Sequence, residues 1–208
     1  MSCPRLVIRS LLFVALLPVA ASAQKNELSA LIGRTLISDQ GIRGATFFPN
    51  FVSSGNGLTL EFNYARRIRE RPVYALSIEV PIALNPDEDL NTGANLIPKQ
   101  YSSVFIAPSA RLNLIPRSFF SPWASLGGGY GHFSESSTLN QDTPNLGNKG
   151  TNTGVLQVGA GFDVRFWHSL CARLAVRDYY SGLPELNVDI GKSRQHNFFV
   201  GGGLMVRF

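Results

Sequence analysis

One short stretch of the sequence carries residue types that could activate a nucleophile. His132 and Ser134 lie two residues apart in the run His132-Phe133-Ser134. In an extended strand this spacing places both side chains on one face, where an imidazole can accept the proton of a hydroxyl group. The stretch is therefore compatible with the nucleophilic step of a hydrolase.

The same stretch resembles part of the His-x-Ser motif of the outer-membrane lipid A deacylases, which are themselves eight-stranded barrels. His132 shares its strand face with Leu126 and Tyr130, as an enzyme acting on membrane lipid would require. In that family an asparagine follows the serine, whereas this chain has Glu135. The sequence also offers no carboxylate on the matching face of the next strand to orient the histidine. We favour the interpretation that His132 is an interfacial residue and that Ser134 begins a polar loop, so we assign no catalytic residue.

The other residues with possible chemistry are scattered. The three histidines are far apart in the sequence, at positions 132, 168 and 196. The glycine runs 127–129 and 201–203 do not open a helix, as a phosphate-binding loop would. Cys171 is expected on an inward face without a partner, which argues against a disulfide or redox role. We therefore predict no cofactor and no metal, and the absence of a basic cluster argues against nucleic-acid binding.

The dominant pattern in the chain is the alternation of apolar and polar residues. It is clearest at 156–167, where every second residue is apolar and Gln157, Asp163 and Arg165 stand between. The same period of two recurs in seven more segments: 28–36, 58–65, 73–80, 103–115, 123–133, 170–179 and 197–208. Segments of about 9–11 residues match transmembrane strands, so we predict an all-β, eight-stranded, antiparallel, up-and-down transmembrane β-barrel. Pro108 interrupts the fourth segment and predicts a bulge or kink there.

The connections alternate between short and long. The short ones are 66–72, 116–122 and 167–169, and the long polar ones are 38–57, 85–100, 134–153 and 181–195. Short turns at one end and long loops at the other are typical of outer-membrane barrels, whose long loops face the outside of the cell.

Aromatic residues gather near the predicted strand ends, which suggests two interfacial belts. Near the short turns lie Phe119, Phe120, Trp123, Phe166, Trp167 and Phe208. Near the long loops lie Tyr101, Tyr130, Phe133, Tyr179, Tyr180 and Phe198.

The polar faces of the strands carry charges that we place in a narrow interior. They are Glu61, Glu79, Asp163, Arg111, Arg165, Arg173, Arg177 and Arg207. Buried charges are tolerated only when they are paired or hydrated, so we expect an ionic network in the lumen. The alternative is a soluble, lipocalin-like barrel whose charged faces meet water.

The first 23 residues have the order of a secretory signal peptide. Arg5 and Arg9 form the basic region, residues 11–19 form the apolar run, and Ala21-Ser22-Ala23 is the cleavage site. We expect cleavage after Ala23, which leaves 24–208 as the barrel domain; a retained anchor is the alternative. Losing two arginines lowers the formal charge from +5 to +3, which says little about partners.

These features together resemble the small OmpA-like outer-membrane barrels over essentially the whole mature chain. The ending Leu204-Met205-Val206-Arg207-Phe208 carries the resemblance at the C-terminus. The resemblance implies insertion into the outer membrane of a Gram-negative bacterium, contact with lipid and lipopolysaccharide, and recognition of Phe208 by the barrel-assembly machinery. We expect no peptidoglycan-binding domain, because the barrel occupies the mature chain.

Eight strands leave an interior about wide enough for side chains to fill, so we expect no bulk diffusion of solutes. The expected function is non-enzymatic: a monomer with a structural or surface-interaction role, whose long extracellular loops meet an unknown partner. Three alternatives remain open. They are a narrow, porin-like channel or carrier for small hydrophobic molecules, a lipid A-modifying hydrolase using His132 and Ser134, and a soluble ligand-binding barrel.

Overall fold

The alternating segments fold as antiparallel strands in a computed structural model that describes residues 25–44, 51–55, 57–91 and 96–208. The strands are β1 (Asn26–Leu36), β2 (Gln40–Gly41), β3 (Phe51–Ser54), β4 (Leu58–Glu70), β5 (Tyr74–Asn91), β6 (Gln100–Ile106), β7 (Ser109–Leu114), β8 (Phe120–Glu135), β9 (Thr151–Arg165), β10 (Leu170–Gly182) and β11 (Arg194–Arg207). Within these residues no helix is long and apolar enough to cross a membrane. The predicted signal peptide, 1–23, lies outside the described residues, and its cleavage stays a prediction.

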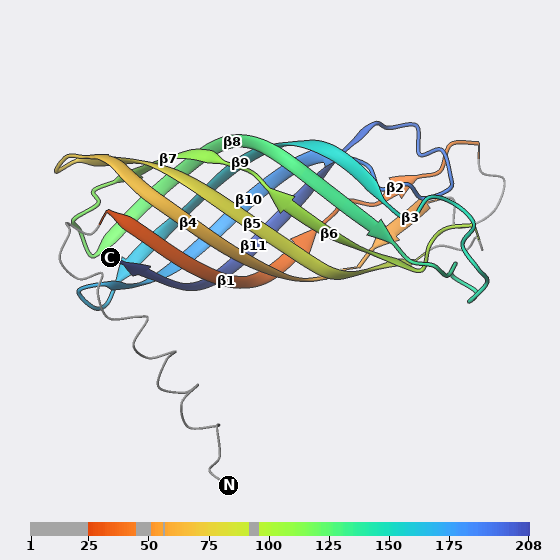
Figure 1. Cartoon of the computed structure of the whole chain (residues 1–208), viewed down its shortest axis with the longest axis horizontal. Helices are drawn as coiled ribbons and strands as arrows, with labels where there is room; N and C mark the ends of the chain where they lie inside the picture. The colour runs from red at the N-terminus through yellow and green to blue at the C-terminus, as the bar shows by residue number, and fades with distance from the viewer. Residues whose placement is uncertain (1–24, 45–50, 56, 92–95) are drawn as a thin grey trace, which may run out of the picture.

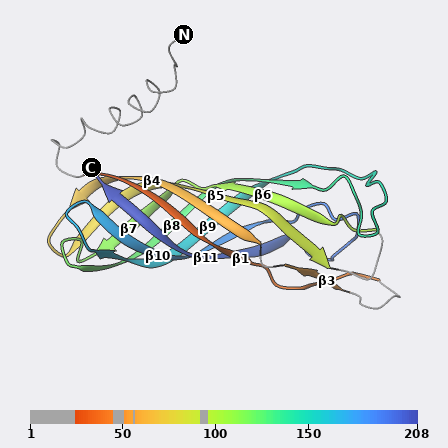
Figure 2. The ribbon, with the colours of Figure 1, turned by 90° about the horizontal axis from the view of Figure 1, so that it is seen from below.

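The strands close into a barrel because the first and the last strand pair with each other. The register of β1 and β11 runs from Glu27 opposite Arg207 to Leu36 opposite Phe198. Around the barrel the walls follow in the order β1, β4, β5, β6 with β7, β8, β9, β10 and β11. The predicted eight-stranded antiparallel barrel is confirmed. Figures 1 and 2 show the C-terminus and the short turns at one end and the long loops, with β2 and β3, at the other.

The predicted kink at Pro108 separates β6 from β7, which together form one wall. The wall stays hydrogen-bonded across the break: the Ala107 amide donates to the Pro81 carbonyl at 3.2 Å, and the Gly128 amide donates to the Pro108 carbonyl at 3.2 Å. A Cβ at Gly127 or Gly129 would collide with the backbone carbonyl oxygens that approach from this wall. The glycine run therefore lets β8 pack against the break.

The barrel turns its apolar face outward and its polar face inward, which is the reverse of a soluble β-protein. Large apolar side chains point outward all round the barrel, among them Leu28, Leu126, Val158, Leu174 and Leu204. Polar side chains occupy most of the alternate, inward positions. An apolar outside around a polar inside is the pattern of a barrel solvated by lipid. On β5 the outward apolar positions end at Leu84, and the strand continues beyond them.

Several strands run further toward the long loops than the sequence suggested. Strand β5 continues to Asn91, eleven residues past the predicted end at Val80, and β8 and β10 continue to Glu135 and Gly182. The predicted loops 85–100, 134–153 and 181–195 therefore begin as hydrogen-bonded ladder, which the polar composition of those stretches concealed. At the short-turn end, β4 likewise extends to Glu70 through the stretch that was predicted as a turn.

The predicted aromatic belts are only partly right. Phe119, Phe120, Phe166 and Trp167 are exposed at the short-turn end, and Tyr130 and Phe198 are exposed at the long-loop end. Four predicted belt residues instead point into the lumen and are at most 3% exposed: Trp123, Tyr101, Phe133 and Tyr179. Each lies at an inward position of its strand, so the side on which it falls overrides its place near a strand end.

Candidate functional site: a filled lumen and an interlocked cap

The charged residues at the inward positions of the strands lie together in the short-turn half of the lumen. Seven of the eight predicted lumen charges are buried there: Glu61, Glu79, Asp163, Arg111, Arg173, Arg177 and Arg207. The prediction was wrong for Arg165, which is half-buried at the mouth, where the strand ends, and donates to the Pro116 carbonyl at 2.8 Å.

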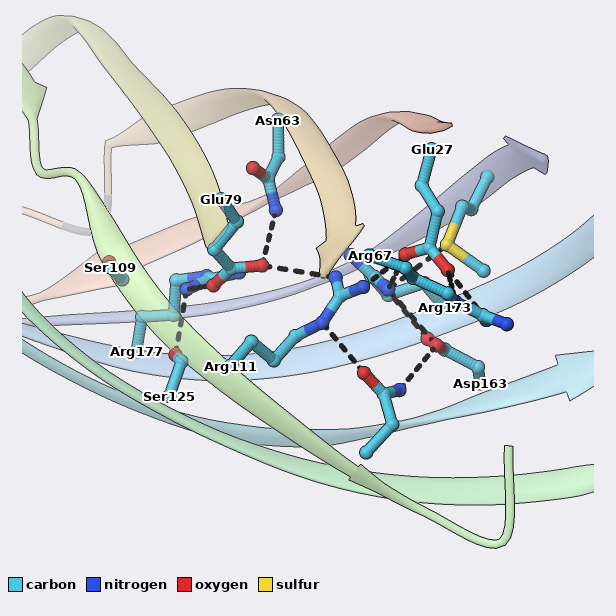
Figure 3. A network of polar contacts seen from close by, with 12 residues as sticks. Glu27, Asn63, Arg67, Glu79, Ser109, Arg111, Ser125, Asp163, Arg173 and Arg177 are labelled. Carbon is cyan, nitrogen blue, oxygen red and sulfur yellow. Dashed lines mark hydrogen bonds and ion pairs between the residues drawn. The ribbon is translucent and has the colours of Figure 1, made fainter. Parts of the chain in front are cut away.

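Glu27, at the start of β1, is the centre of this network (Figure 3). It accepts a hydrogen bond from the Arg67 Nε at 2.9 Å and another from Arg111. The guanidinium groups of Arg207 and Arg173 lie 3.2 and 3.6 Å from its carboxylate. One carboxylate thus contacts arginines from four other strands: β4, β7, β10 and β11.

Neither Glu27 nor Arg67 was among the charges predicted for the lumen. Glu27 lies just outside the predicted strand 28–36, and Arg67 lies in the predicted turn 66–72. Their positions in the alternation could have identified them. Glu27 lies on the same strand face as Ser29, and Arg67 lies on the same strand face as Asn63 and Ala65.

Arg177 holds a second group of ion pairs next to the first. Its Nε donates to Glu61 at 3.1 Å, and its Nη1 donates to Glu79 at 2.7 Å and to the Ser125 hydroxyl at 3.0 Å. Glu79 also accepts from Arg111 at 3.0 Å, so Arg111 connects the two groups.

Asp163 completes the network with a two-point contact. The Nε and Nη2 of Arg173 donate to its two oxygens at 2.8 and 3.0 Å. The Trp123 ring lies beside this layer, with the guanidinium carbons of Arg173 and Arg177 at 5.3 and 4.9 Å from the ring centroid. Trp123 thereby adds cation–π contacts to both arginines. Such dense pairing is what makes the burial of these charges tolerable.

The long-loop half of the lumen is filled by aromatic rings. Phe105 stacks on Tyr179 with the ring centroids 5.3 Å apart. It also meets Phe133 edge-on at 5.6 Å, and Phe133 meets Tyr101 at 5.7 Å. The Tyr179 hydroxyl donates to Glu61 at 3.2 Å and so links the aromatic layer to the ionic one. Side chains therefore fill both halves of the interior.

Hydrogen bonds between the long connections build a cap over this end of the barrel. The Glu135 carboxylate accepts from the Thr151 hydroxyl at 3.0 Å and from the Glu185 amide at 2.9 Å. The Asn187 side chain donates to Asn145 at 2.9 Å and to the Leu96 carbonyl at 3.2 Å. The connections after β5, β8 and β10 are thus tied to one another.

Glu88 is a buried carboxylate of this cap, four residues beyond the last outward apolar position of β5. It accepts hydrogen bonds from the Gly57 amide and the Asn85 side chain, both at 3.1 Å. Burial, together with the neighbouring charges of Asp89 and Asp87, raises the pKa of Glu88 to about 7 despite these bonds.

The His132 stretch lies on the outer wall near the long-loop end. The His132 Nδ1 lies 2.7 Å from the side-chain oxygen of Asn152 on β9, which also accepts from the Tyr130 hydroxyl at 2.6 Å. Ser134 is exposed, and in the described part of the chain no hydrogen bond joins it to His132. The orienting partner that the sequence analysis did not find is therefore present as an amide rather than as a carboxylate.

Two further features concern the thiol and metal chemistry considered from the sequence. Cys171 is a free cysteine and is buried. The described residues contain no group of three or more His, Cys, Asp or Glu side chains that could hold a metal ion.

Among known proteins, this chain is similar in fold to solved outer-membrane barrels. No protein-family model and no curated sequence matches it. The outer-membrane protein OprG from Pseudomonas aeruginosa is 13% identical, and the alignment covers 90% of this chain and 99% of OprG with a TM-score of 0.53. Neisserial surface protein A is also 13% identical, with 89% and 98% covered and a TM-score of 0.50. The predicted likeness to small eight-stranded outer-membrane barrels is confirmed at the level of the fold.

Proposed function

We propose that this chain is a non-enzymatic protein of the bacterial outer membrane that displays its interlocked cap to the outside of the cell. The observation that carries the proposal is a lumen filled by side chains beneath a hydrogen-bonded cap. Such a barrel anchors a surface and offers no path for bulk solute. The fold and the outward apolar belt support the location, and lipid together with lipopolysaccharide is the environment that this belt suits.

The cap is the part of the molecule suited to meet a partner. Leu146 stands out from it, with 96% of its surface exposed. A fully exposed leucine on a hydrogen-bonded loop can insert into an apolar site of another macromolecule at little ordering cost. We further propose that the chain works as a monomer, and that the assembly machinery reads its C-terminal strand through Phe208.

Cysteine labelling of intact cells tests the location and the orientation. Leu146→Cys places a thiol on the cap, and His168→Cys places one in an exposed short turn; the native Cys171 is buried. A membrane-impermeant maleimide should label the first variant in intact cells and the second only after permeabilisation. Labelling in the reverse order, or recovery of the protein in the soluble periplasm, would contradict the proposal.

Planar-bilayer recordings test the absence of a conducting path. The wild-type barrel should give no discrete current steps, because both halves of the lumen are occupied. Steps that persist after repurification would favour the narrow channel instead. Retention of a hydrophobic compound by the purified barrel would favour the carrier.

The hydrogen bond between His132 and Asn152 favours a second candidate, a hydrolase of membrane lipid. An asparagine that accepts from Nδ1 leaves Nε2 free to act as a base, as in the Cys-His-Asn arrangement of some proteases. Ser134 would be the nucleophile on the same outward face, at the level where lipid acyl chains meet their head groups.

Mass spectrometry of lipid A separates the two candidates. Cells that express the wild type should show unaltered lipid A if the protein is non-enzymatic. Loss of one acyl chain in wild-type cells, abolished by Ser134→Ala and by His132→Ala, would establish the hydrolase. Tyr130→Phe is the matched control, because it removes a neighbouring hydrogen bond and neither proposed reactive group.

A further inference from the structure

The short-turn mouth of the lumen is a recess of about 460 Å³ with a strongly cationic lining. Its cationic side chains are Lys25, Arg67, Arg69, Arg117 and Arg165. Glu70 is the single carboxylate among the lining residues. This volume lies within the ~300–1,000 Å³ usual for small-molecule sites.

The recess spans the opening of the barrel and does not lie along one wall. Arg67 and Arg69 come from the end of β4, Arg165 comes from the end of β9, and Arg117 comes from the turn between β7 and β8. Strands β4 and β9 are not neighbours in the sheet. A molecule in the recess would therefore be approached by cations from two sides.

The acidic groups at this end leave most of the positive charge uncompensated. Glu70 pairs with Arg67 at 3.0 Å and with Arg117 at 3.3 Å. Arg67 is also shared with Glu27 of the lumen network. In the described part of the chain, neither Lys25 nor Arg69 has an ion-pair partner. Five cations against one local carboxylate give a focused positive potential at the mouth.

Arg165 adds an observation that independently points to a missing partner. One of its terminal nitrogens donates to the Pro116 carbonyl at 2.8 Å. Its Nε is buried and has no hydrogen-bond partner within the described residues. A buried guanidinium donor without an acceptor is costly, so the arrangement suits an acceptor supplied from outside the chain.

We propose that this mouth binds a phosphate-bearing anion, held by Arg69, Arg117 and Arg165. The planar fork of a guanidinium group matches two phosphate oxygens at once, and bonds of this kind are the stronger class of hydrogen bond. Several converging arginines suit an anion with more than one negative charge. The recess faces the periplasm if the orientation under Proposed function holds, but the binding chemistry does not depend on that orientation.

Two sources could present this chemistry at the mouth. One is a soluble phosphorylated compound that enters along the barrel axis. The other is the head group of a phospholipid in the adjoining leaflet, because Ile68 of the same recess is 60% exposed on the outer wall.

Titration calorimetry with pyrophosphate tests the site on the full mature barrel in phosphatidylcholine nanodiscs. The wild type should bind, and more weakly as salt rises. The double variant Arg69→Gln/Arg117→Gln should bind about tenfold or more weakly, because two charge-assisted contacts are lost. Lys192→Gln/Arg194→Gln, with the same loss of charge at the long-loop end, should bind as the wild type does. An unchanged gel-mobility shift on boiling shows that each variant is folded.

Nanodiscs with phosphatidylglycerol distinguish the two sources. If a lipid head group fills the site, pyrophosphate affinity falls more in these discs for the wild type than for Arg69→Gln/Arg117→Gln. If the ligand is soluble, the anionic surface of the discs lowers the affinity of both proteins by the same factor. Absence of pyrophosphate binding in phosphatidylcholine discs, or equal binding by the wild type and the double variant, overturns the proposal. Neither result bears on the cysteine labelling, so the two proposals fail separately.

Discussion

The two halves of the lumen are equally buried and are stabilised by different physics. In the short-turn half, carboxylates and guanidinium groups meet at hydrogen-bond distance from walls far apart in the sequence, as Glu27 meets Arg67, Arg111 and Arg207. In the long-loop half, aromatic rings such as Phe105 and Phe133 pack by shape. Ion pairs demand one register, whereas apolar packing tolerates small shifts. We therefore expect the ionic half to specify how the barrel closes and the aromatic half to fill the remaining volume.

The largest effect should follow from removing the central carboxylate. Glu27→Gln keeps the shape of the side chain but leaves four arginines without their shared anion. Breaking a buried ion pair from one side costs about 3–5 kcal/mol, and we expect a loss of that size or failure to refold. Urea unfolding in detergent micelles, followed by gel mobility, measures it.

Glu70→Gln is the matched control for this substitution. It removes the same group from the edge of the mouth, where about a third of the Glu70 side chain is exposed. Exposed pairs are worth about 0–1 kcal/mol, so the change should be small. Equal losses for Glu27→Gln and Glu70→Gln would break the distinction between the ionic interior and its edge.

A smaller effect should follow from a change in the aromatic half. Phe105→Leu keeps most of the volume and removes two ring contacts, to Tyr179 and Phe133. Aromatic pairs contribute about 0.5–1.5 kcal/mol each, so we expect a loss of about 1–3 kcal/mol with a normal gel-mobility shift. A loss as large as that of Glu27→Gln would mean that the aromatic half also specifies closure.

The same contrast explains what could be predicted from the sequence. Charges at inward positions, such as Arg111 and Arg177, stand out because alternation makes them anomalous among apolar neighbours. Trp123 and Tyr179 do not stand out, because an aromatic residue near a strand end is equally compatible with an interfacial belt. Strand parity would have separated the two cases, because both residues lie inside predicted strands, on the parity opposite to the outward Leu126 and Leu174.

The pairing of specific charges lay beyond any local pattern. That Glu27 meets Arg111 depends on how β1, β4, β5 and β7 follow one another around the barrel and on the stagger of each ladder. The order of the walls was predictable from the short turns. The stagger was not, because the register shifts between Arg67 and Arg69 and between Asn85 and Glu88 each displace a ladder.

The cap offers a test in which the buried group, Glu88, has no cationic partner among the residues that the structure describes. Glu88 has a pKa raised to about 7, so the folded cap binds its proton more tightly than the unfolded chain, in which the ordinary pKa is 4.5. The folded state therefore loses stability as pH rises from about 4.5 to about 7, and the full penalty remains above that. Amide exchange of residues 85–90 should become faster over this range, by about tenfold or more beyond the acceleration that base catalysis gives every amide.

Glu88→Gln sharpens the same test. The amide cannot ionise, so exchange at 85–90 should lose most of its excess dependence on pH, and at pH 8 the variant should exchange more slowly than the wild type. Glu185→Gln, on another connection of the cap, should leave the profile unchanged. If exchange in the wild type slows as pH rises, beyond the intrinsic trend of the amides, Glu88 has an ionised partner and the assignment is wrong.

The smallest effect should come from a hydrogen bond of similar length on the outer wall. Asp178 lies 2.6 Å from the His196 ring, and more than half of the His196 side chain is exposed. Asp163 lies 2.8 Å from Arg173, and both are buried. Distance alone would rank the outer pair at least as strong. Burial ranks them the other way, because water and lipid head groups can replace the contact outside the barrel and nothing replaces it inside.

We therefore expect Asp178→Asn to lower the free energy of unfolding in urea by at most about 1 kcal/mol, well below the loss for Asp163→Asn. If the two substitutions proved equally costly, the ionic half would owe its stability to contact geometry, and enclosure in the lumen would have no separate role.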